Sequence, residues 1–364
     1  MVKVAPHSSK PLEAGAGTLG LWYHPQMNLP ERLSLAHLPT PVHQLETLSE
    51  TLGVEIIIKR DDLTGSHLSG NKIRKLEYLL AQAAADNATH VLTCGGIQSN
   101  HCRATALAAA SLGMKPELLL RTAHGLQTDL PTPSSGNVLL DRLSGATIHL
   151  CDPEGYRHER GARMAEIASV LTAKGERPVI IPEGGSSALG SLGYVDAARE
   201  LVEQLGADEP TNVWVAVGSG GTLAGLALGF KSLGVPYRAV GVPVCDDAPT
   251  FRAIVQEISR EASQSFGLSA LDDDDYDLVE GFQGEGYGLT TAVELSGIRD
   301  AVQRDGIVLD HVYTGKAYRA MLSHLATKGP HKRTVFIHTG GIFGLGAAAS
   351  KLDTVLGAGG GAHP

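Results

Sequence analysis

The segment around Lys72 has the residue types of a covalent catalytic site. Lys72 follows Ser69-Gly70-Asn71 and opens a helical pattern that continues as Ile73-Arg74-Lys75-Leu76-Glu77. The positive end of a helix disfavours an ammonium, so an amine placed there is shifted towards its neutral, nucleophilic form. A neutral amine can form an imine with an aldehyde. The segment therefore predicts that Lys72 carries a cofactor, and a solvated surface lysine is the open alternative.

A glycine-rich segment, Gly218-Ser219-Gly220-Gly221-Thr222, follows the apolar run Val213 to Val217 and precedes a second helical pattern. Backbone amides at the start of a helix bind anions, so this loop predicts a phosphate site. It does not fit a dinucleotide fingerprint, because the third glycine of GxGxxG falls on Leu223, and it lacks the GK[ST] ending of a P-loop. A tight turn that binds nothing is the alternative.

A third polar segment, Gln98-Ser99-Asn100-His101, also follows an apolar run and opens an alanine-rich helical pattern. Ser99 fits the N-cap of that helix, and a lone histidine is typically a surface or packed residue. Three adjacent side chains that donate or accept protons also fit a site that binds a carboxylate and moves a proton. We therefore predict that Ser99, Asn100 and His101 contact the substrate, while Cys102 packs inside the helix.

Composition restricts the classes of partner. The chain has 364 residues, 43% of them hydrophobic and 19% charged, with a formal charge of −9 and a pI near 5.9. These values suit a globular protein and argue against binding to nucleic acid or anionic membranes, which reward clustered lysine and arginine. No apolar run reaches membrane-spanning length, and the first residues lack the pattern of a secretory signal. We expect a cytoplasmic protein that acts on a small molecule.

The four cysteines form no CxxC pair and no metal-like spacing with histidine. This predicts a reducing compartment and no metal site.

Short apolar runs alternate with helical patterns along the chain, which predicts an α/β fold with mostly parallel sheets covered by helices. The expected strands are Glu55 to Lys59, His90 to Thr93, Glu117 to Leu120, Thr147 to Cys151, Pro178 to Ile181, Val213 to Val217, Ala239 to Val242 and Thr334 to His338. The expected helices are Lys72 to Ala85, Ser99 to Leu112, Ser135 to Leu143, Arg157 to Thr172, Gly193 to Leu205, Thr222 to Leu233, Thr290 to Arg304 and Lys316 to Thr327. Because ligands of such sheets bind beyond the carboxyl ends of strands, the three polar segments can converge.

The order of elements predicts two domains. A smaller α/β domain, residues 74–182, is inserted into a larger cofactor-binding domain built from residues 1–73 and 183–364. Residues 1 to about 30 are expected to form a surface arm. Residues 263 to 275, which end in the acidic run Asp272 to Asp275, are expected to form a solvated loop, and the tail from Gly357 is expected to be frayed.

The motifs KRDD, GNKxRKLE, GGIQSNH, GSGGTLAG, VYTGKA and HTGG, spread from about Leu38 to Gly341, carry a family resemblance. The chain resembles the fold-type II pyridoxal phosphate enzymes of the 1-aminocyclopropane-1-carboxylate (ACC) deaminase and D-cysteine desulfhydrase group. The resemblance implies a two-domain, three-layer α/β/α fold like that of the tryptophan synthase β subunit. It also implies a homodimer, pyridoxal 5'-phosphate as cofactor and an amino-acid substrate.

The resemblance assigns roles to the residues of these motifs. Lys72 would be the covalent anchor of the cofactor and Asn100 the partner of its ring oxygen. The loop Gly218 to Thr222, with Lys75, would hold the phosphate. Ser99 resembles the side chain next to the substrate carboxylate and Cα. Tyr287 and Tyr313 resemble the paired tyrosines over the substrate.

The residue types at two positions, those of Thr314 and Thr339, differ between members of the group. The position of Thr314 is a glutamate in the deaminase, which keeps the pyridine nitrogen protonated and the ring a strong electron sink. A threonine hydroxyl only hydrogen-bonds that nitrogen, which suffices for β-elimination. Thr339 also resembles the desulfhydrase, since the deaminase has a leucine there. The chain departs from the usual motifs at Ser69, His311 and Ile342-Phe343-Gly344, which changes the pocket wall.

The resulting expectation is a carbon-sulfur lyase that converts D-cysteine to pyruvate, hydrogen sulfide and ammonia. Other β-substituted amino acids are alternative substrates, among them β-chloro-D-alanine, D-serine and L-cysteate, whose sulfonate would need a cation such as Arg121 or His101. Less favoured alternatives are ACC deamination, a carrier of cofactor or amino acid without turnover, and a nicotinamide-dependent dehydrogenase.

Overall fold

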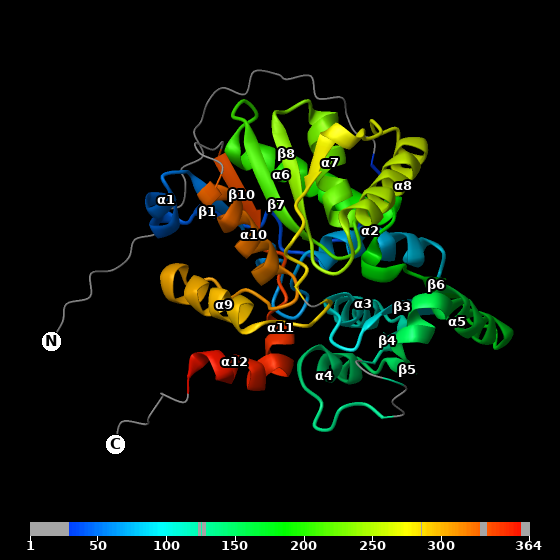
Figure 1. The fold of residues 1–364 in the computed structure, drawn as a ribbon. Helices are drawn as coiled ribbons and strands as arrows, with labels where there is room; N and C mark the ends of the chain where they lie inside the picture. The colour runs from blue at the N-terminus through cyan, green and yellow to red at the C-terminus, as the bar shows by residue number, and fades with distance from the viewer. Residues whose placement is uncertain (1–28, 123–124, 126–128, 285, 328–332, 358–364) are drawn as a thin grey trace.

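Two β-sheets with helices on both faces organise the chain (Figure 1). The computed structural model describes residues 29–122, 125, 129–284, 286–327 and 333–357. The larger sheet has six strands in the order β1-β2-β10-β7-β8-β9, and the smaller has four in the order β5-β4-β3-β6. All neighbouring strands are parallel except β1 and β2.

The strands of the larger sheet are β1 Val42–Gln44, β2 Ile56–Lys59, β7 Thr211–Val217, β8 Tyr237–Pro243, β9 Tyr276–Leu278 and β10 Arg333–Ile337. Its helices are α1 Glu46–Leu52, α6 Ala188–Leu205, α7 Gly221–Leu233, α8 Ala248–Phe266, α9 Ala292–Asp305 and α10 Thr314–Thr327, followed by α11 Ile342–Leu345 and α12 Ala349–Leu356. Helix α2, Lys72–Ala85, lies between the two sheets and buries most of its apolar residues against the smaller one. Alternate residues of β7 enter opposite cores, as a strand buried on both faces requires. Val213 and Val215 pack with α6, α7 and α8, whereas Trp214 and Ala216 pack with α1, α9 and α10.

The smaller sheet consists of β3 His90–Gly96, β4 Lys115–Arg121, β5 Thr147–Cys151 and β6 Pro178–Ile180. Its helices are α3 Asn100–Ser111, α4 Gly136–Leu143 and α5 Pro153–Ala173. Leu118 and Leu120 pack against α3 and α4, while Leu119 packs against α5. These strands all fall within residues 74–182, but the exact domain boundaries stay a prediction.

Close backbone packing joins α2, α6 and α7. A Cβ added to Gly193 would lie 2.3 Å from the backbone oxygen of Arg74, and one added to Gly225 would lie 2.3 Å from that of Ser191. Only glycine permits such contacts. The sequence placed the start of α6 at Gly193, but the helix begins at Ala188, so this expected start is wrong by five residues.

The predicted α/β class with mostly parallel sheets is confirmed, and each expected strand and helix is present, most of them with shifted ends. The α2 helix has the predicted bounds. The sequence missed β1, β9, α1, α8, α11 and α12. The loop expected over residues 263 to 275 is wrong in part, because α8 continues to Phe266 and Asp273–Asp275 form a 3₁₀ turn. An apolar face of α8, which includes Phe251 and Val255, is buried against the larger sheet and stabilises this helix.

The predicted N-terminal arm up to residue 28 and the predicted tail after Gly357 lie outside the described residues. Within the described ranges, no helix is long and apolar enough to cross a membrane.

Candidate active site

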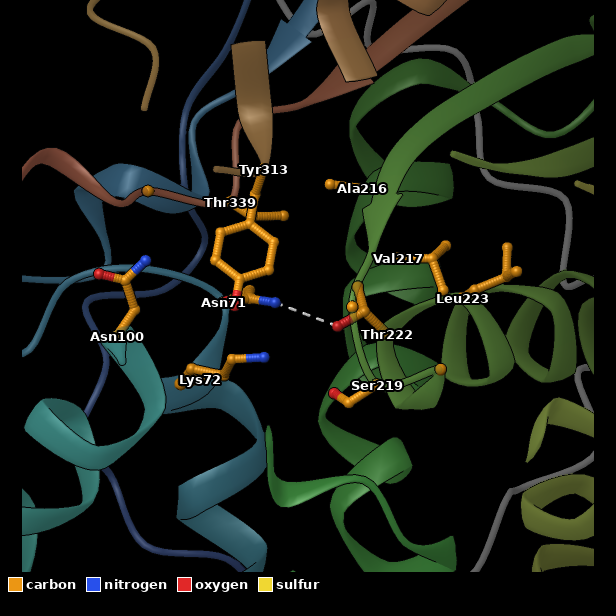
Figure 2. A pocket seen from close by; sticks show the side chains of 13 residues that line it. Asn71, Lys72, Asn100, Ala216, Val217, Ser219, Thr222, Leu223, Tyr313 and Thr339 are labelled. Carbon is orange, nitrogen blue, oxygen red and sulfur yellow. Dashed lines mark hydrogen bonds between the residues drawn. The ribbon is translucent and has the colours of Figure 1, made fainter. Parts of the chain in front are cut away.

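The carboxyl ends of β7 and β10 and the starts of α2, α3, α7 and α10 surround one pocket (Figure 2). The pocket encloses about 430 Å³ when the open solvent at its mouth is counted. Many of the predicted site residues meet here. The pocket is lined by Lys72, Asn100, Gly218, Ser219, Gly220, Thr222, Tyr313 and Thr339, together with neighbouring residues of the same segments.

A pinned turn places Lys72 at the pocket. Gly70 has a φ of +99°, and a Cβ there would lie 2.8 Å from the backbone oxygen of Thr339. Asn71 donates a backbone hydrogen bond of 3.1 Å to the same oxygen, and its side chain donates to the Thr222 hydroxyl at 3.1 Å. Lys72 then begins α2 and extends towards Ser219 (Figure 2). The turn before Lys72 is therefore hydrogen-bonded both to the segment after β10, which holds Thr339, and to the start of α7, which holds Thr222.

The Lys72 amine is suited to act as a nucleophile. Burial lowers its pKa from 10.5 to about 8. No described residue forms a hydrogen bond or a salt bridge of 4.0 Å or less with its Nζ atom. A desolvated amine without a bound carboxylate carries a larger neutral fraction near neutral pH than a solvated lysine does.

The glycine loop and Lys75 lie together and fit the predicted anion site. The loop leads into α7, whose first amides have no partner within the helix, and the Gly221 amide donates to Ser186 Oγ at 3.1 Å. Lys75 Nζ donates to Gly184 O and to Ser186 Oγ, each at 3.2 Å, and a Cβ added to Gly221 would lie 2.9 Å from this Nζ. Burial, together with repulsion from Lys72, lowers the pKa of Lys75 well below its usual value.

No described carboxylate lies within 4.0 Å of either lysine nitrogen. Two buried amines without an anionic partner are costly when charged, and a phosphate at this anion site would compensate them. The residues present therefore fit the phosphate group of pyridoxal phosphate.

At the start of α3, Ser99 is the N-cap and its hydroxyl accepts from the Cys102 amide at 3.2 Å. The Asn100 carbonyl oxygen accepts from the Asn137 side chain at 2.9 Å, which leaves the Asn100 amino group to donate into the pocket. Asn137 is a supporting residue that the sequence did not single out. It follows Ser135-Gly136 at the start of α4, and no local pattern links it to Asn100.

His101 lies behind the pocket wall. It is 3% exposed, its Nε2 atom is 2.9 Å from the Thr93 hydroxyl, and it does not line the pocket. Burial and the nearby Lys72 and Lys75 amines lower its pKa well below 6.5. His101 is therefore a neutral, packed histidine in this structure.

Tyr313 lines the pocket and pairs with Tyr287, which lies behind it and does not line the pocket. Their hydroxyl oxygens are 2.9 Å apart, with Tyr313 as donor, and their rings meet edge to face at 5.9 Å. Burial raises the pKa of Tyr287 to about 12 and that of Tyr313 well above 10. Both phenols therefore stay protonated near neutral pH and can donate hydrogen bonds.

A buried lysine missed by the sequence analysis supports Tyr287. Lys316 on α10 is 1% exposed and donates to the backbone oxygens of Gln283 at 2.6 Å and Gly286 at 3.0 Å. It fixes the segment that carries Tyr287 to the helix that begins one residue after Tyr313. Lys316 belongs to the VYTGKA motif, but its partners lie about thirty residues earlier and leave no local signal.

Thr314 is fully buried and does not line the pocket. Its hydroxyl donates to a carboxylate oxygen of Asp310 at 2.7 Å and accepts from the Asp310 amide at 2.7 Å. Asp310 also accepts from the Tyr313 amide at 3.0 Å and so organises the start of α10. A contact between Thr314 and a pyridine nitrogen stays a prediction that requires this hydroxyl to leave Asp310.

Comparison with known proteins shows the family of this chain. Residues 33–340 match the family of pyridoxal-phosphate dependent enzymes. The chain belongs to this family. The predicted cofactor, enzyme class and family resemblance are confirmed.

A mitochondrial protein of Arabidopsis thaliana named bifunctional D-cysteine desulfhydrase/1-aminocyclopropane-1-carboxylate deaminase is 39% identical, over 89% of this chain and 81% of its own. D-cysteine desulfhydrase of Klebsiella pneumoniae is 39% identical, over 85% of this chain and 94% of its own. The crystal structure of an ACC deaminase homologue is 36% identical, covers 90% of this chain and 97% of its own, and superposes with a TM-score of 0.81. Both activity names therefore occur among the relatives.

Proposed function

We propose that this protein is a carbon-sulfur lyase that converts D-cysteine and water to pyruvate, hydrogen sulfide and ammonia. The observation that carries the proposal is a threonine, Thr314, beside Tyr313 at the start of α10. A glutamate would be expected at this position in a deaminase. Thr339 at the pocket wall agrees with the same choice. D-cysteine desulfhydrase in the names of two relatives, one of them bifunctional, adds support.

Lys72 is the proposed covalent anchor and base. Bound pyridoxal phosphate supplies an electron sink for the bond that breaks at the substrate Cα. The lowered pKa of the Lys72 amine allows it to accept the Cα proton near neutral pH and to return a proton later. The glycine loop and Lys75 hold the phosphate, and Asn100 donates to the ring oxygen.

The polar groups around Lys72 orient the substrate and assist the leaving group. The start of α3, with Ser99, offers amides and a hydroxyl for the substrate carboxylate. Tyr287 and Tyr313 remain protonated, so they donate a hydrogen bond or a proton to the departing sulfur rather than act as bases. The tyrosine pair is therefore the proposed acid.

A substrate panel tests the proposal. Purified holoprotein is incubated with D-cysteine, L-cysteine, L-cysteate and ACC, and keto acid, sulfide and ammonia are measured. We expect pyruvate and sulfide in equal amounts from D-cysteine and none from a Lys72→Ala control. Keto-acid release only from ACC would contradict the proposal. A cofactor spectrum that responds to amino acids without any keto acid would instead indicate a carrier.

The homodimer, the cytoplasmic location and the individual residue roles stay predictions.

A further inference from the structure

Arg121 places a cation beside the proposed tyrosine pair. It is the last residue of β4, paired with Gly96 at the end of β3, so it lies at the carboxyl edge of the smaller sheet. Its guanidinium carbon lies 4.9 Å from the centre of the Tyr287 ring and 5.4 Å from the centre of the Tyr156 ring. A Cβ added to Gly96 would approach Tyr287 to 3.1 Å and the Arg121 guanidinium to 3.8 Å.

This guanidinium has no anionic partner among the described residues. It contacts two aromatic faces, but no described side chain or backbone oxygen accepts a hydrogen bond from it and no described carboxylate lies within 4.0 Å. The nearby Glu183 carboxylate accepts from the Tyr156 hydroxyl at 2.8 Å and lies 3.8 Å from Arg160. Arginine presents five donors in a fork that matches planar and tetrahedral anions. Arg121 is therefore a partly buried cation with free donors.

The other groups of the site are not available to bind a second anionic group of the substrate. The substrate carboxylate is already assigned to Ser99 at the start of α3. His101, the second cation considered from the sequence, is buried against Thr93 and neutral. Arg121 does not line the pocket itself, but its guanidinium lies against the ring of Tyr287, so it is the cation that a second negative charge next to the tyrosine pair would meet.

We propose that Arg121 forms an anion subsite for the β-substituent of the amino-acid substrate, which selects substituents that carry negative charge, such as a sulfonate or a thiolate. The inference rests on the proposed elimination reaction and names the substrate class of that site.

The test compares cysteate with β-chloroalanine, both in the enantiomer that reacts. Both release pyruvate, but only cysteate has a charged β-substituent, which leaves as sulfite. In Arg121→Gln, kcat/KM for cysteate should fall at least about tenfold more than kcat/KM for β-chloroalanine, the size expected from a lost charge-assisted hydrogen bond. Arg121→Lys should restore part of the difference. Arg160→Gln is the matched control, because Arg160 lies 5.7 Å from the centre of the same Tyr156 ring but pairs with Glu183, and it should leave the ratio unchanged.

A binding measurement separates this inference from the proposed reaction. 3-Sulfopropanoate has both negative groups but no amine, so calorimetry with the holoprotein reports binding without turnover. Arg121→Gln should weaken it at least about tenfold and leave propanoate unchanged. Equal losses for both lyase substrates, or equal binding of 3-sulfopropanoate by wild type and Arg121→Gln, would overturn the subsite. If no substrate is eliminated, the proposed reaction fails, and the calorimetry still decides on Arg121.

Discussion

Gly184→Ala should weaken cofactor binding by displacing the glycine loop. Gly184 has a φ of +67°, and a Cβ there would lie 2.1 Å from Ser219 Oγ, 2.9 Å from Ser219 Cβ and 3.5 Å from Lys72 Nζ. Carbon and oxygen atoms need a separation of roughly 3.2 Å or more, so Ser219 must move by about 1 Å. A hydroxyl rotation alone does not suffice, because the Ser219 Cβ is also too close. The loop would lose its 2.8 Å contact between Ser219 and Ser186.

Loss of one hydrogen bond from the loop to the phosphate costs about 1.5–3 kcal/mol, so we expect pyridoxal phosphate to bind Gly184→Ala about 10- to 100-fold more weakly. Gly175→Ala is the matched control, since Gly175 has a φ of +83° and nothing within 4 Å of an added Cβ. In both variants an alanine must adopt a positive φ, which lowers the free energy of unfolding by about 1 kcal/mol. Thermal unfolding of the cofactor-free proteins measures this loss. Titration of the same proteins with cofactor, followed by absorbance, gives the affinity. Equal affinity in both variants would refute this account of the loop.

Three further predictions concern the lysines and the buried charges. Because the pKa of Lys72 falls from 10.5 to about 8, its neutral fraction at pH 7 is about 300 times that of a free lysine. The rate at which cofactor-free protein takes up pyridoxal phosphate should therefore rise with pH and level off above about pH 8, and a rise that continues to pH 10 would contradict this pKa. Lys316→Met should lower turnover about tenfold or more with little change in the cofactor spectrum, because it frees only the segment that carries Tyr287; loss of cofactor binding would argue for a wider role. Asp61→Asn should lower the free energy of unfolding measured in urea by about 3 kcal/mol, because the fully buried Asp61 pairs with the buried Arg74. A decrease below about 1 kcal/mol would show that the pair contributes little to stability.

The sequence predicts the start of α2 well because the signal is local. A glycine turn precedes Lys72, and the helical period begins at once. The glycine loop before α7 is local in the same way. The convergence of both segments follows from the parallel sheet, which gathers strand ends at one edge.

The contacts that support these residues are not local. The contacts of Lys316 with Gln283 and of Asn137 with Asn100 join residues more than thirty positions apart in the sequence, so no rule of residue spacing predicts these contacts. Sequence also cannot show which way a hydroxyl points, and Thr314 turns towards Asp310 instead of lining the pocket. In contrast, α8 has an N-cap residue and an apolar face that are both visible in the sequence, but this helix was not predicted.

The covalent role of Lys72 is the central claim, and reduction of the holoprotein with borohydride tests it most directly. Reduction fixes the cofactor to the amine that carries it, and peptide mapping by mass spectrometry identifies that amine. We predict a single labelled site at Lys72. Label on Lys75 or another lysine, or no label in a protein that has bound the cofactor, would contradict the account.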